Sequence, residues 1–371
     1  MALKVWVIGA YGNFGRIVCR HLSREPGIEL TLAGRNAARL EALAAALGGQ
    51  PQRWCGDAHS PAFAEALREQ RAQLVIHTGG PFQGQAYTVA EHCLAAGAHY
   101  CDLADCRTFV NGIGVLDAQA QAAGVALLSG CSSVPTLSSA LIDEHRARFA
   151  RIEHIEHGIS SSAKMPGLST VQGVLAYAGQ PILQRRGGQP QPVPGWQGLV
   201  LRRLPGLGWR LLANVDVPDM DLFGPRYGAR SLSFKAGPGL MAGALANWLL
   251  AAARRLRLVD DPTPWAARLH RLGLRCERFG DGLSAMYIDC RGHGQQGQPL
   301  RLRLQLTASH DKGPEIPSCA AVALARKLAA GYRPAAGARP CVGELSVAEY
   351  LAAIGDEQHV RLTAQWHEGR G

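Results

Sequence analysis

Short apolar runs alternate with amphipathic stretches through the first 130 residues, and this alternation limits the possible folds more than any other feature. In the stretch 84–97, Tyr87, Ala90, Cys93 and Leu94 recur at helical spacing. Apolar strands separated by such helices predict a parallel sheet covered on both faces, and right-handed crossovers make it doubly wound. We therefore expect an α/β protein whose residues 1–135 form a Rossmann domain. The expected strands are 3–9, 28–34, 51–57, 73–78, 98–103 and 124–130.

The pattern changes after Ser139, where a second domain is expected over residues 136–312. In the segment 300–309, leucines alternate with polar residues, which is the period of a strand with one solvated face. The segment 283–292 reads as its partner, and the glycines between the two favour a hairpin turn. The second domain is therefore expected to be α+β with an antiparallel sheet.

Three glycines give the sharpest motif of the chain. Gly9, Gly12 and Gly15 directly follow the first expected strand and open a helix. In such a turn the backbone can approach a diphosphate, and the helix N-terminus offers amide groups and a positive dipole end to the phosphates. The motif predicts a dinucleotide site, with a purely structural glycine turn as the alternative. The residues expected to bind there are Gly9, Tyr11, Gly12, Asn13, Phe14 and Gly15.

The end of the second strand indicates which dinucleotide binds. NAD enzymes usually place a carboxylate there, whereas this chain has Arg35 followed by Asn36. A guanidinium can bind the extra phosphate of NADP, so NADP is favoured over NAD. The alternative for Arg35 is a solvated residue at a helix start.

Two further strand ends are candidates, because ligands lie beyond the carboxyl ends of parallel strands. Asp57 is expected either to accept a bond from the adenine amine or to cap the next helix near Ser60. The loop Thr78, Gly79, Gly80 and Pro81 is expected to line the ribose and nicotinamide.

Taken together, several segments resemble the saccharopine dehydrogenase family in its broad NADP-binding sense. They are GAYGNFG (9–15), AGRNAARLEALA (33–44), HTGGPFQGQAYTVAEHCLAAGAHYCDLAD (77–105), GCSSVPTLSSALID (130–143) and HDKGPEIPSCAAVALARKLA (310–329). The resemblance implies NADP(H) at Gly9, Gly12, Gly15 and Arg35, with the Gly80-Pro81 and Asp102 loops beside the nicotinamide. It also implies a mixed α/β substrate domain and a C-terminal segment, residues 313–371, that packs back on the Rossmann domain. The substrate that gives the family its name is not carried over, because the middle of the chain shows no pattern that assigns it.

Catalytic residues are weakly marked in this sequence. Hydride transfer needs positioning and a proton source, so polar side chains at strand ends or on the second domain are candidates. Each of them is also readily explained as a cap, a core residue or a surface residue. The named candidates are Asp102, Lys164 and Tyr227, with Asp105, Cys131, Arg226, His310 and His77 considered beside them.

Composition excludes some classes of function. The net charge of +10 is spread as arginine along the chain without a nucleic-acid recognition motif, so a phosphate-bearing cofactor and a carboxylate substrate explain it better. The ten cysteines show no metal-ligand spacing, so no metal site is expected. The chain passes at once into a strand, so we expect no signal peptide and a cytoplasmic protein.

The function favoured by these observations is an NADP-dependent oxidoreductase acting on a C=N or C=O bond of a small, carboxylate-bearing molecule. Alternatives are a non-catalytic NADP-binding sensor or scaffold, and a peripheral membrane reductase of a lipid-like substrate. The last rests on the apolar run 236–252, for which a buried helix is favoured over a membrane contact. The sequence leaves the oligomeric state open, a homodimer included.

Overall fold

The computed structural model describes residues 2–162 and 164–369, and the chain forms two compact units. Of these described residues, unit 1 comprises those up to Ala140 and Pro314–Gly355, and unit 2 comprises those from Leu141 to Gly313 and from Asp356 onward. The segment 313–371 is expected from the sequence to pack as a whole on the first domain. In the structure the last part of that segment instead forms a strand of the second unit's sheet.

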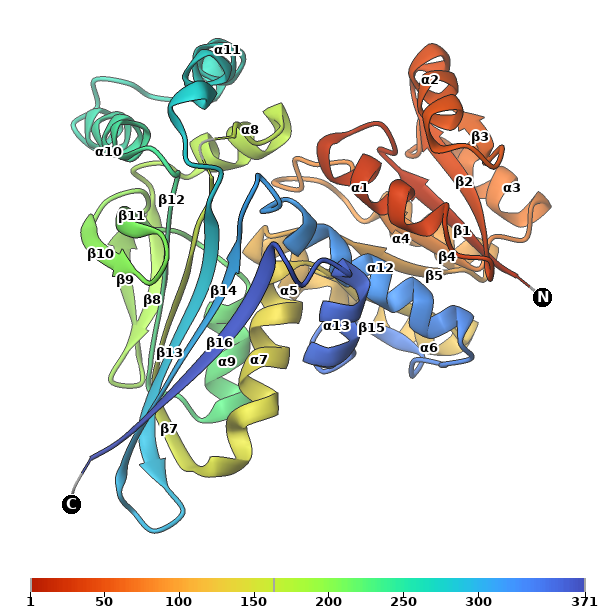
Figure 1. The fold of residues 1–371 in the computed structure, drawn as a ribbon. Coiled ribbons are helices and arrows are strands. Elements are labelled where there is room, and N and C mark those ends of the chain that lie inside the picture. The colour runs from red at the N-terminus through yellow and green to blue at the C-terminus, as the bar shows by residue number, and fades with distance from the viewer. Residues whose placement is uncertain (1, 163, 370–371) are drawn as a thin grey trace. The chain divides into compact units, whose positions relative to one another are not determined.

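Unit 1 is built on a seven-stranded sheet in the order β15-β6-β5-β4-β1-β2-β3, and every neighbouring pair is parallel (Figure 1). The predicted doubly wound Rossmann sheet is confirmed, because β1 lies at the point where the strand order reverses. The strands are β1 (Leu3–Ile8), β2 (Ile28–Gly34), β3 (Gln52–Cys55), β4 (Leu74–His77), β5 (His99–Asp102), β6 (Ala126–Ser129) and β15 (Gly337–Pro340).

Helices cover both faces of this sheet. On one face Trp6 packs edge-on against Phe63 of α3 in a large apolar cluster that includes Cys93 of α4 and Ala120 of α6. On the other face α1 packs against α12. The helices of unit 1 are α1 (Asn13–Leu22), α2 (Ala37–Leu47), α3 (Pro61–Glu69), α4 (Thr88–Ala96), α5 (Arg107–Gly112), α6 (Asp117–Ala123), α7 (Ser138–His145, whose second half belongs to unit 2), α12 (Glu315–Ala329) and α13 (Val347–Ile354), with short turns at Ile113–Leu116 and Ser133–Leu137.

The late helix α12 belongs to unit 1 because it is apolar on nearly every side. Eleven of its residues are buried, and a helix of that kind has to be covered by other elements. It packs between α1 and α13, where the Tyr350 hydroxyl donates to the carbonyl oxygen of Ile316. Helix α12 therefore completes one face of the Rossmann sheet.

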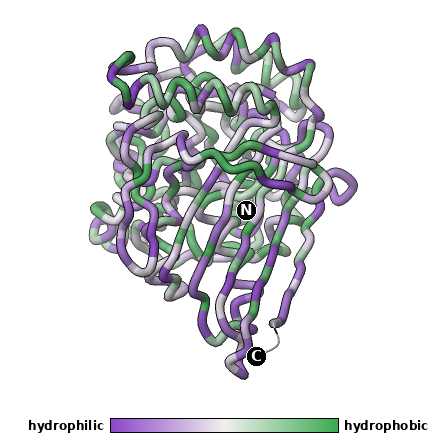
Figure 2. The backbone as a smooth tube through the Cα atoms, turned by 90° about the vertical axis from the view of Figure 1, so that its left-hand side faces the viewer, coloured by the Kyte–Doolittle hydropathy of each residue, from purple (hydrophilic) through white to green (hydrophobic). Residues whose placement is uncertain are grey.

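Unit 2 contains a mixed sheet in the order β10-β11-β12-β7-β13-β14-β16, with β8 and β9 attached beside β12. The predicted antiparallel hairpin is confirmed: β13 and β14 pair in register from Ser284↔Ala308 to His293↔Pro299, while β7 and β12 run parallel. Hydrophilic and hydrophobic residues alternate along these long strands (Figure 2). The strands are β7 (Phe149–Ser160), β8 (Pro181–Arg186), β9 (Gln189–Pro194), β10 (Val200–Leu204), β11 (Gly208–Asn214), β12 (Ser231–Gly237), β13 (Ser284–Gly294), β14 (Pro299–Ala308) and β16 (Val360–Glu368).

The helices of unit 2 differ in how deeply they are buried. Asp219 of α9 lies fully buried against the sheet, where its Oδ1 is 3.2 Å from Nε2 of His157. In contrast, α10 starts at Met241 within the apolar run 236–252, and only Ala244 and Ala251 of the helix are buried. The expectation of a buried helix in this run is therefore wrong. No helix in the described part of the chain is long and apolar enough to cross a membrane. The helices are α8 (Leu168–Ala176), α9 (Asp219–Tyr227), α10 (Met241–Arg255) and α11 (Ala266–Cys276), with short turns at Arg146–Arg148, Thr263–Trp265 and Glu277–Phe279.

Candidate dinucleotide-binding site

The glycine turn after β1 is folded as its sequence predicts. Gly9 has a φ of +74°, a left-handed conformation that glycine adopts without strain. The Gly12 amide donates to the Gly9 carbonyl oxygen at 2.8 Å, and α1 begins at the next residue. A Cβ atom on Gly15 would overlap the Gly9 carbonyl oxygen, so glycine is needed there for the helix to lie this close to the turn.

The N-terminus of α1 is electrostatically suited to an anion. Its N-cap is Gly12, which has no side chain to occupy the first amide groups of the helix. The first turn contains no acidic residue and includes Arg16. The amides and the helix dipole therefore favour a negative group at this end of α1.

The end of β4 is bonded to the glycine turn. Oγ1 of Thr78 donates to the Ile8 carbonyl oxygen at 2.7 Å, and a Cβ atom on Gly9 would lie 2.8 Å from that hydroxyl oxygen. The Gly80-Pro81 peptide bond is cis. Nε2 of Gln85 donates to the carbonyl oxygens of Gly79 (3.1 Å) and Pro81 (2.6 Å), which fixes the loop shape. Sequence reasoning missed Gln85, since a glutamine in a loop gives no signal of the carbonyls it will bind.

The end of β2 is joined to the same turn through Tyr11. The Tyr11 hydroxyl accepts from the Arg35 amide at 3.1 Å, and its ring lies so close to Gly34 that a Cβ atom there would be 2.6 Å away. The Arg35 side chain is exposed. The guanidinium of Arg39, which the sequence analysis did not single out, lies 5.7 Å from the centre of the Tyr11 ring. Asn36 caps α2, because its Oδ1 accepts from the Arg39 amide at 3.0 Å.

Asp57 lies at the end of β3 in a turn before α3. Its Oδ1 accepts from the His59 amide at 3.0 Å and lies 3.1 Å from Nδ1 of the His59 ring. The amide hydrogen bond, followed by the bond to the ring, lowers the pKa of the Asp57 carboxyl. Asp57 thus closes the turn that precedes Ser60, the N-cap residue of α3, instead of capping the helix itself, and the adenine contact stays a prediction.

The catalytic candidate Asp102 is completely buried between the ends of β5 and β6. Its Oδ1 accepts from the amides of Gly130 (2.8 Å) and Ala104 (2.9 Å), and its carbonyl oxygen accepts from the Cys131 amide at 2.7 Å. Burial raises the pKa of the carboxyl to about 6, although these amides act to lower it. The Asp102 carboxylate thus holds two strand ends together.

Neighbouring buried groups of unit 1 are equally enclosed. Burial lowers the pKa of His77 to about 3, and its Nδ1 lies 3.2 Å from the Tyr100 hydroxyl, as expected of a core histidine. Hydrogen bonding to Cys101, together with burial, raises the pKa of the Cys131 thiol, which disfavours the thiolate that a nucleophile requires. Asp105, three residues after Asp102, is exposed and does not belong to this enclosed group.

The remaining catalytic candidates belong to unit 2. Lys164 is exposed. The Tyr227 side chain is buried, and its hydroxyl donates to Oδ1 of Asp143 at 3.0 Å. Arg226 binds the same carboxylate, with its Nη2 2.5 Å from Oδ2, so Arg226 and Tyr227 both anchor α9 to Asp143. The exposed ring of His310 packs edge-on against His359 at 4.7 Å between centres.

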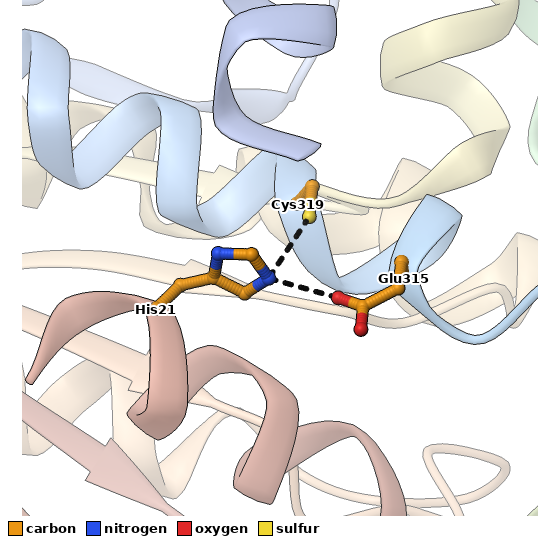
Figure 3. Close-up of side chains that lie close together, drawn as sticks. All are labelled: His21, Glu315 and Cys319. Carbon is orange, nitrogen blue, oxygen red and sulfur yellow. Dashed lines mark hydrogen bonds and ion pairs between the residues drawn. The ribbon is translucent and has the colours of Figure 1, made fainter. Parts of the chain in front are cut away.

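Within unit 1, a cluster of potential metal ligands joins residues far apart in sequence (Figure 3). His21 of α1 and Glu315 and Cys319 of α12 each offer one ligand atom within 4.8 Å of the others. Nε2 of His21 lies 2.8 Å from the Glu315 carboxylate and 4.0 Å from the Cys319 sulfur. The guanidinium of Arg20 also contacts Glu315, so the carboxylate already has a cationic partner. The cluster forms an ion-pair connection between α1 and α12.

Residues 5–128 match the family model described as the saccharopine dehydrogenase NADP binding domain. For residues 5–128, this match confirms the resemblance to the saccharopine dehydrogenase family and NADP as the expected cofactor. A trans-acting enoyl reductase of Mycobacterium leprae is 34% identical over 135 residues, which are 34% of this chain and 32% of that protein. One of Mycobacterium tuberculosis is 31% identical over 135 residues, with the same coverage. The chain thus aligns with about a third of the length of the curated relatives it matches.

The fold of the whole chain also has a solved counterpart. Apo saccharopine dehydrogenase (L-Glu forming) of Saccharomyces cerevisiae superposes with a TM-score of 0.66 at 13% sequence identity. The superposition covers 98% of this chain and 100% of that one. At this level of identity the similarity concerns the fold, and it agrees with the predicted Rossmann domain followed by a mixed α/β domain.

Replacing Gly15 by alanine tests the close approach of α1 to the glycine turn. We expect Gly15→Ala to lose about 1–3 kcal/mol of unfolding free energy, because the methyl group forces the turn apart, and to weaken NADPH binding. Gly27→Ala is the control, since its Cβ would meet only Ala329 at 3.9 Å. Urea unfolding and NADPH fluorescence titration measure both quantities, and equal behaviour of the two variants would contradict the expectation.

The raised pKa of Asp102 predicts a pH-dependent stability difference. Between about pH 4 and pH 6 the folded protein binds a proton at Asp102 that the unfolded chain releases, so the group's contribution to stability falls as pH rises through this window. In Asp102→Asn this dependence disappears. The wild type should therefore lose stability relative to the variant between pH 4 and pH 6 in urea unfolding.

Asp57→Asn is the control: the lowered pKa of Asp57 places its effect below about pH 4, with the opposite sign. If the difference in unfolding free energy between the wild type and Asp102→Asn did not change between pH 4 and pH 6, this account of the buried carboxyl would be refuted.

Proposed function

We propose that this chain is an NADP-dependent oxidoreductase of the saccharopine dehydrogenase-like type, which transfers a hydride to or from a C=N or C=O bond of a small, carboxylate-bearing substrate. The observation that carries the proposal is the joined geometry of three strand ends around the α1 N-terminus. Tyr11 connects the glycine turn to the end of β2, and Thr78 connects it to the end of β4. In a doubly wound sheet this edge is where a dinucleotide lies.

The preference for NADP over NAD rests on charges at the end of β2. The exposed guanidinium of Arg35 and that of Arg39 beside the Tyr11 ring supply two cations next to the expected adenosine ribose. Asp57 at the end of β3 is held by His59. A guanidinium pairs well with a phosphate, so these side chains would bind the 2′-phosphate of NADP.

For the nicotinamide end we propose the loop 78–81 and the segment after β5. NADP supplies the hydride chemistry, and the chain's own residues hold the ring and exclude water. Gln85 stiffens the first loop and Asp102 fixes the second, so both support the site through the backbone. Of the two proton-donor candidates in unit 2, the Lys164 ammonium is exposed, whereas Asp143 engages the Tyr227 hydroxyl. Lys164 is the better candidate.

The names of the mycobacterial relatives add a third type of bond to the candidate hydride acceptors. They are called enoyl reductases, so the C=C bond of an enoyl group joins C=N and C=O as a candidate hydride acceptor. We place the reaction in the cytoplasm, because all ten cysteines are free thiols, which suits a reducing compartment.

A second candidate function is a non-catalytic NADP-binding sensor or scaffold. It is favoured by the way in which titratable candidates serve the structure: Asp102 holds two strand ends and Tyr227 anchors a helix. In this case the bound dinucleotide would regulate a partner rather than reduce a substrate.

The cofactor assignment predicts a specific effect of Arg35→Asp. The variant should bind NADPH about tenfold or more weakly, because a charged hydrogen bond is lost and a like charge faces the phosphate. Its affinity for NADH should change little. Arg24→Asp makes the same charge change on an exposed residue just after the far end of α1 and is the control. Calorimetric titration with both dinucleotides measures the effect, and equal wild-type affinity for NADPH and NADH would overturn the assignment.

Hydride transfer itself is tested by the consumption of NADPH. We expect the protein to oxidise NADPH in the presence of at least one class among imines formed from aldehydes and amino acids, carbonyl acids and enoyl thioesters. Gly15→Ala should abolish the signal and Gly27→Ala should retain it. Tight NADPH binding with no consumption across these classes would reject the enzyme and support the sensor.

A further inference from the structure

Helix α10 is unusual because it is apolar around its circumference and yet lies at the surface of unit 2. Residues 236–253 contain no charged side chain. Only Ala244 and Ala251 of the helix are buried, while Leu245 is 45% and Leu249 61% exposed. A helix of this composition is normally covered by other apolar groups.

The exposed apolar surface extends beyond α10. Helices α8, α10 and α11 share one small core, in which Leu250 and Leu269 pack against Val171, Leu175 and Ala266. Nine of the fourteen large hydrophobic side chains that are exposed in the described chain lie between residues 241 and 279. We call this set, which belongs to α10, α11 and the segments that join and follow them, the α10–α11 face: Met241, Leu245, Leu249, Leu256, Leu258, Trp265, Leu272, Leu274 and Phe279. The two helices lie at the top of Figure 2, where hydrophobic and hydrophilic stretches alternate along the chain.

Positive charge accompanies this apolar surface. The segment 254–278 contains seven arginines against Asp260, Asp261 and Glu277. Arg254 is used internally, since its guanidinium binds the carbonyl oxygens of Ala176 and Ala178. The other six are all exposed, namely Arg255, Arg257, Arg268, Arg271, Arg275 and Arg278.

The sign of this charge distinguishes between possible partners. Two copies of the chain meeting through this face around a twofold axis would bring arginines against arginines, which opposes association. An anionic bilayer offers an apolar interior for the leucines and phosphate groups for the guanidinium groups. Trp265, at the start of α11, has the amphipathic ring that favours the headgroup region.

We propose that the α10–α11 face binds the surface of an anionic lipid bilayer, with both helices lying in the plane of the headgroups. The 15 residues of α10 are too few to span a bilayer, so the contact is peripheral. The proposal is independent of the oxidoreductase assignment, because it uses none of the residues of the dinucleotide site.

Vesicle sedimentation with the full-length protein tests the proposal. The probes are phosphatidylcholine vesicles and vesicles in which about a third of the lipid is phosphatidylglycerol. We expect the protein to sediment with the anionic vesicles at low salt and to bind them about tenfold more weakly at high salt, because salt screens the arginines. Failure to sediment with anionic vesicles at low salt, or equal binding to both vesicle types, would overturn the proposal.

Two variants distinguish binding through the α10–α11 face from nonspecific adsorption to vesicles. Leu249→Glu places a charge on the exposed side of α10 and should reduce vesicle binding about tenfold. Leu201→Glu alters a similarly exposed leucine, 57% exposed on β10 of the same unit, and should bind as the wild type does. Circular dichroism and NADPH affinity should be unchanged in both variants.

Light scattering of the protein without lipid tests whether a second copy of the chain covers the α10–α11 face. A monomer at all concentrations is expected. A dimer that dissociates in Leu249→Glu but persists in Leu201→Glu would show that a second copy covers the face, and it would reject the bilayer proposal. Equal loss of vesicle binding in both variants would reject it as well.

Discussion

The contact on which unit 1 depends is the close approach of the α1 backbone to the turn after β1. Gly15 packs against the carbonyl oxygen of Gly9 at a distance that leaves no room for a side chain. This contact directs the α1 N-terminus toward the carboxyl edge of the sheet. Thr78 and Tyr11 then bond the ends of β4 and β2 to the same turn, so three strand ends form one site.

The second organising feature of unit 1 is its closure by a segment from late in the sequence. Helix α12 is apolar on nearly every side, and the face of α1 gives it a place to be buried. Glu315 then pairs with Arg20 and His21 at the margin of that contact. Burial supplies the driving force, and the charged groups fix the position of the helix.

The buried carboxylates of Asp102 and Asp219 hold elements of the fold together. Asp102 accepts hydrogen bonds from backbone amides at two strand ends, and Asp219, the first residue of α9, lies against His157 of β7. Titratable residues at strand ends or beside glycines are natural candidates for catalysis in a sequence. Their hydrogen bonds show instead that Asp102 pairs with backbone amides and Asp219 with a histidine ring, as buried polar groups require.

The sequence by itself determined the Rossmann sheet, its glycine turn, the arginine at the end of β2 and the antiparallel hairpin of unit 2. These features are encoded locally, in the period of apolar residues and in glycines that permit one backbone path. The β15 strand escaped prediction because four residues that include Pro340 carry no periodic signal. The same holds for Gln85 and Arg39, since the role of each depends on the loop or ring against which it packs.

Only the tertiary structure decided where the late segments go and what remains exposed. The sequence of α12 is apolar enough to require burial, but burial against α1 depends on contacts such as that of Arg20 with Glu315, which are 295 positions apart. The last strand, β16, pairs with β14 of unit 2, although the preceding helices belong to unit 1. For α10, composition predicted burial, but in the fold all but two of its residues are partly or largely exposed. The reason is that hydropathy states what a helix prefers to contact and not which partner is within reach.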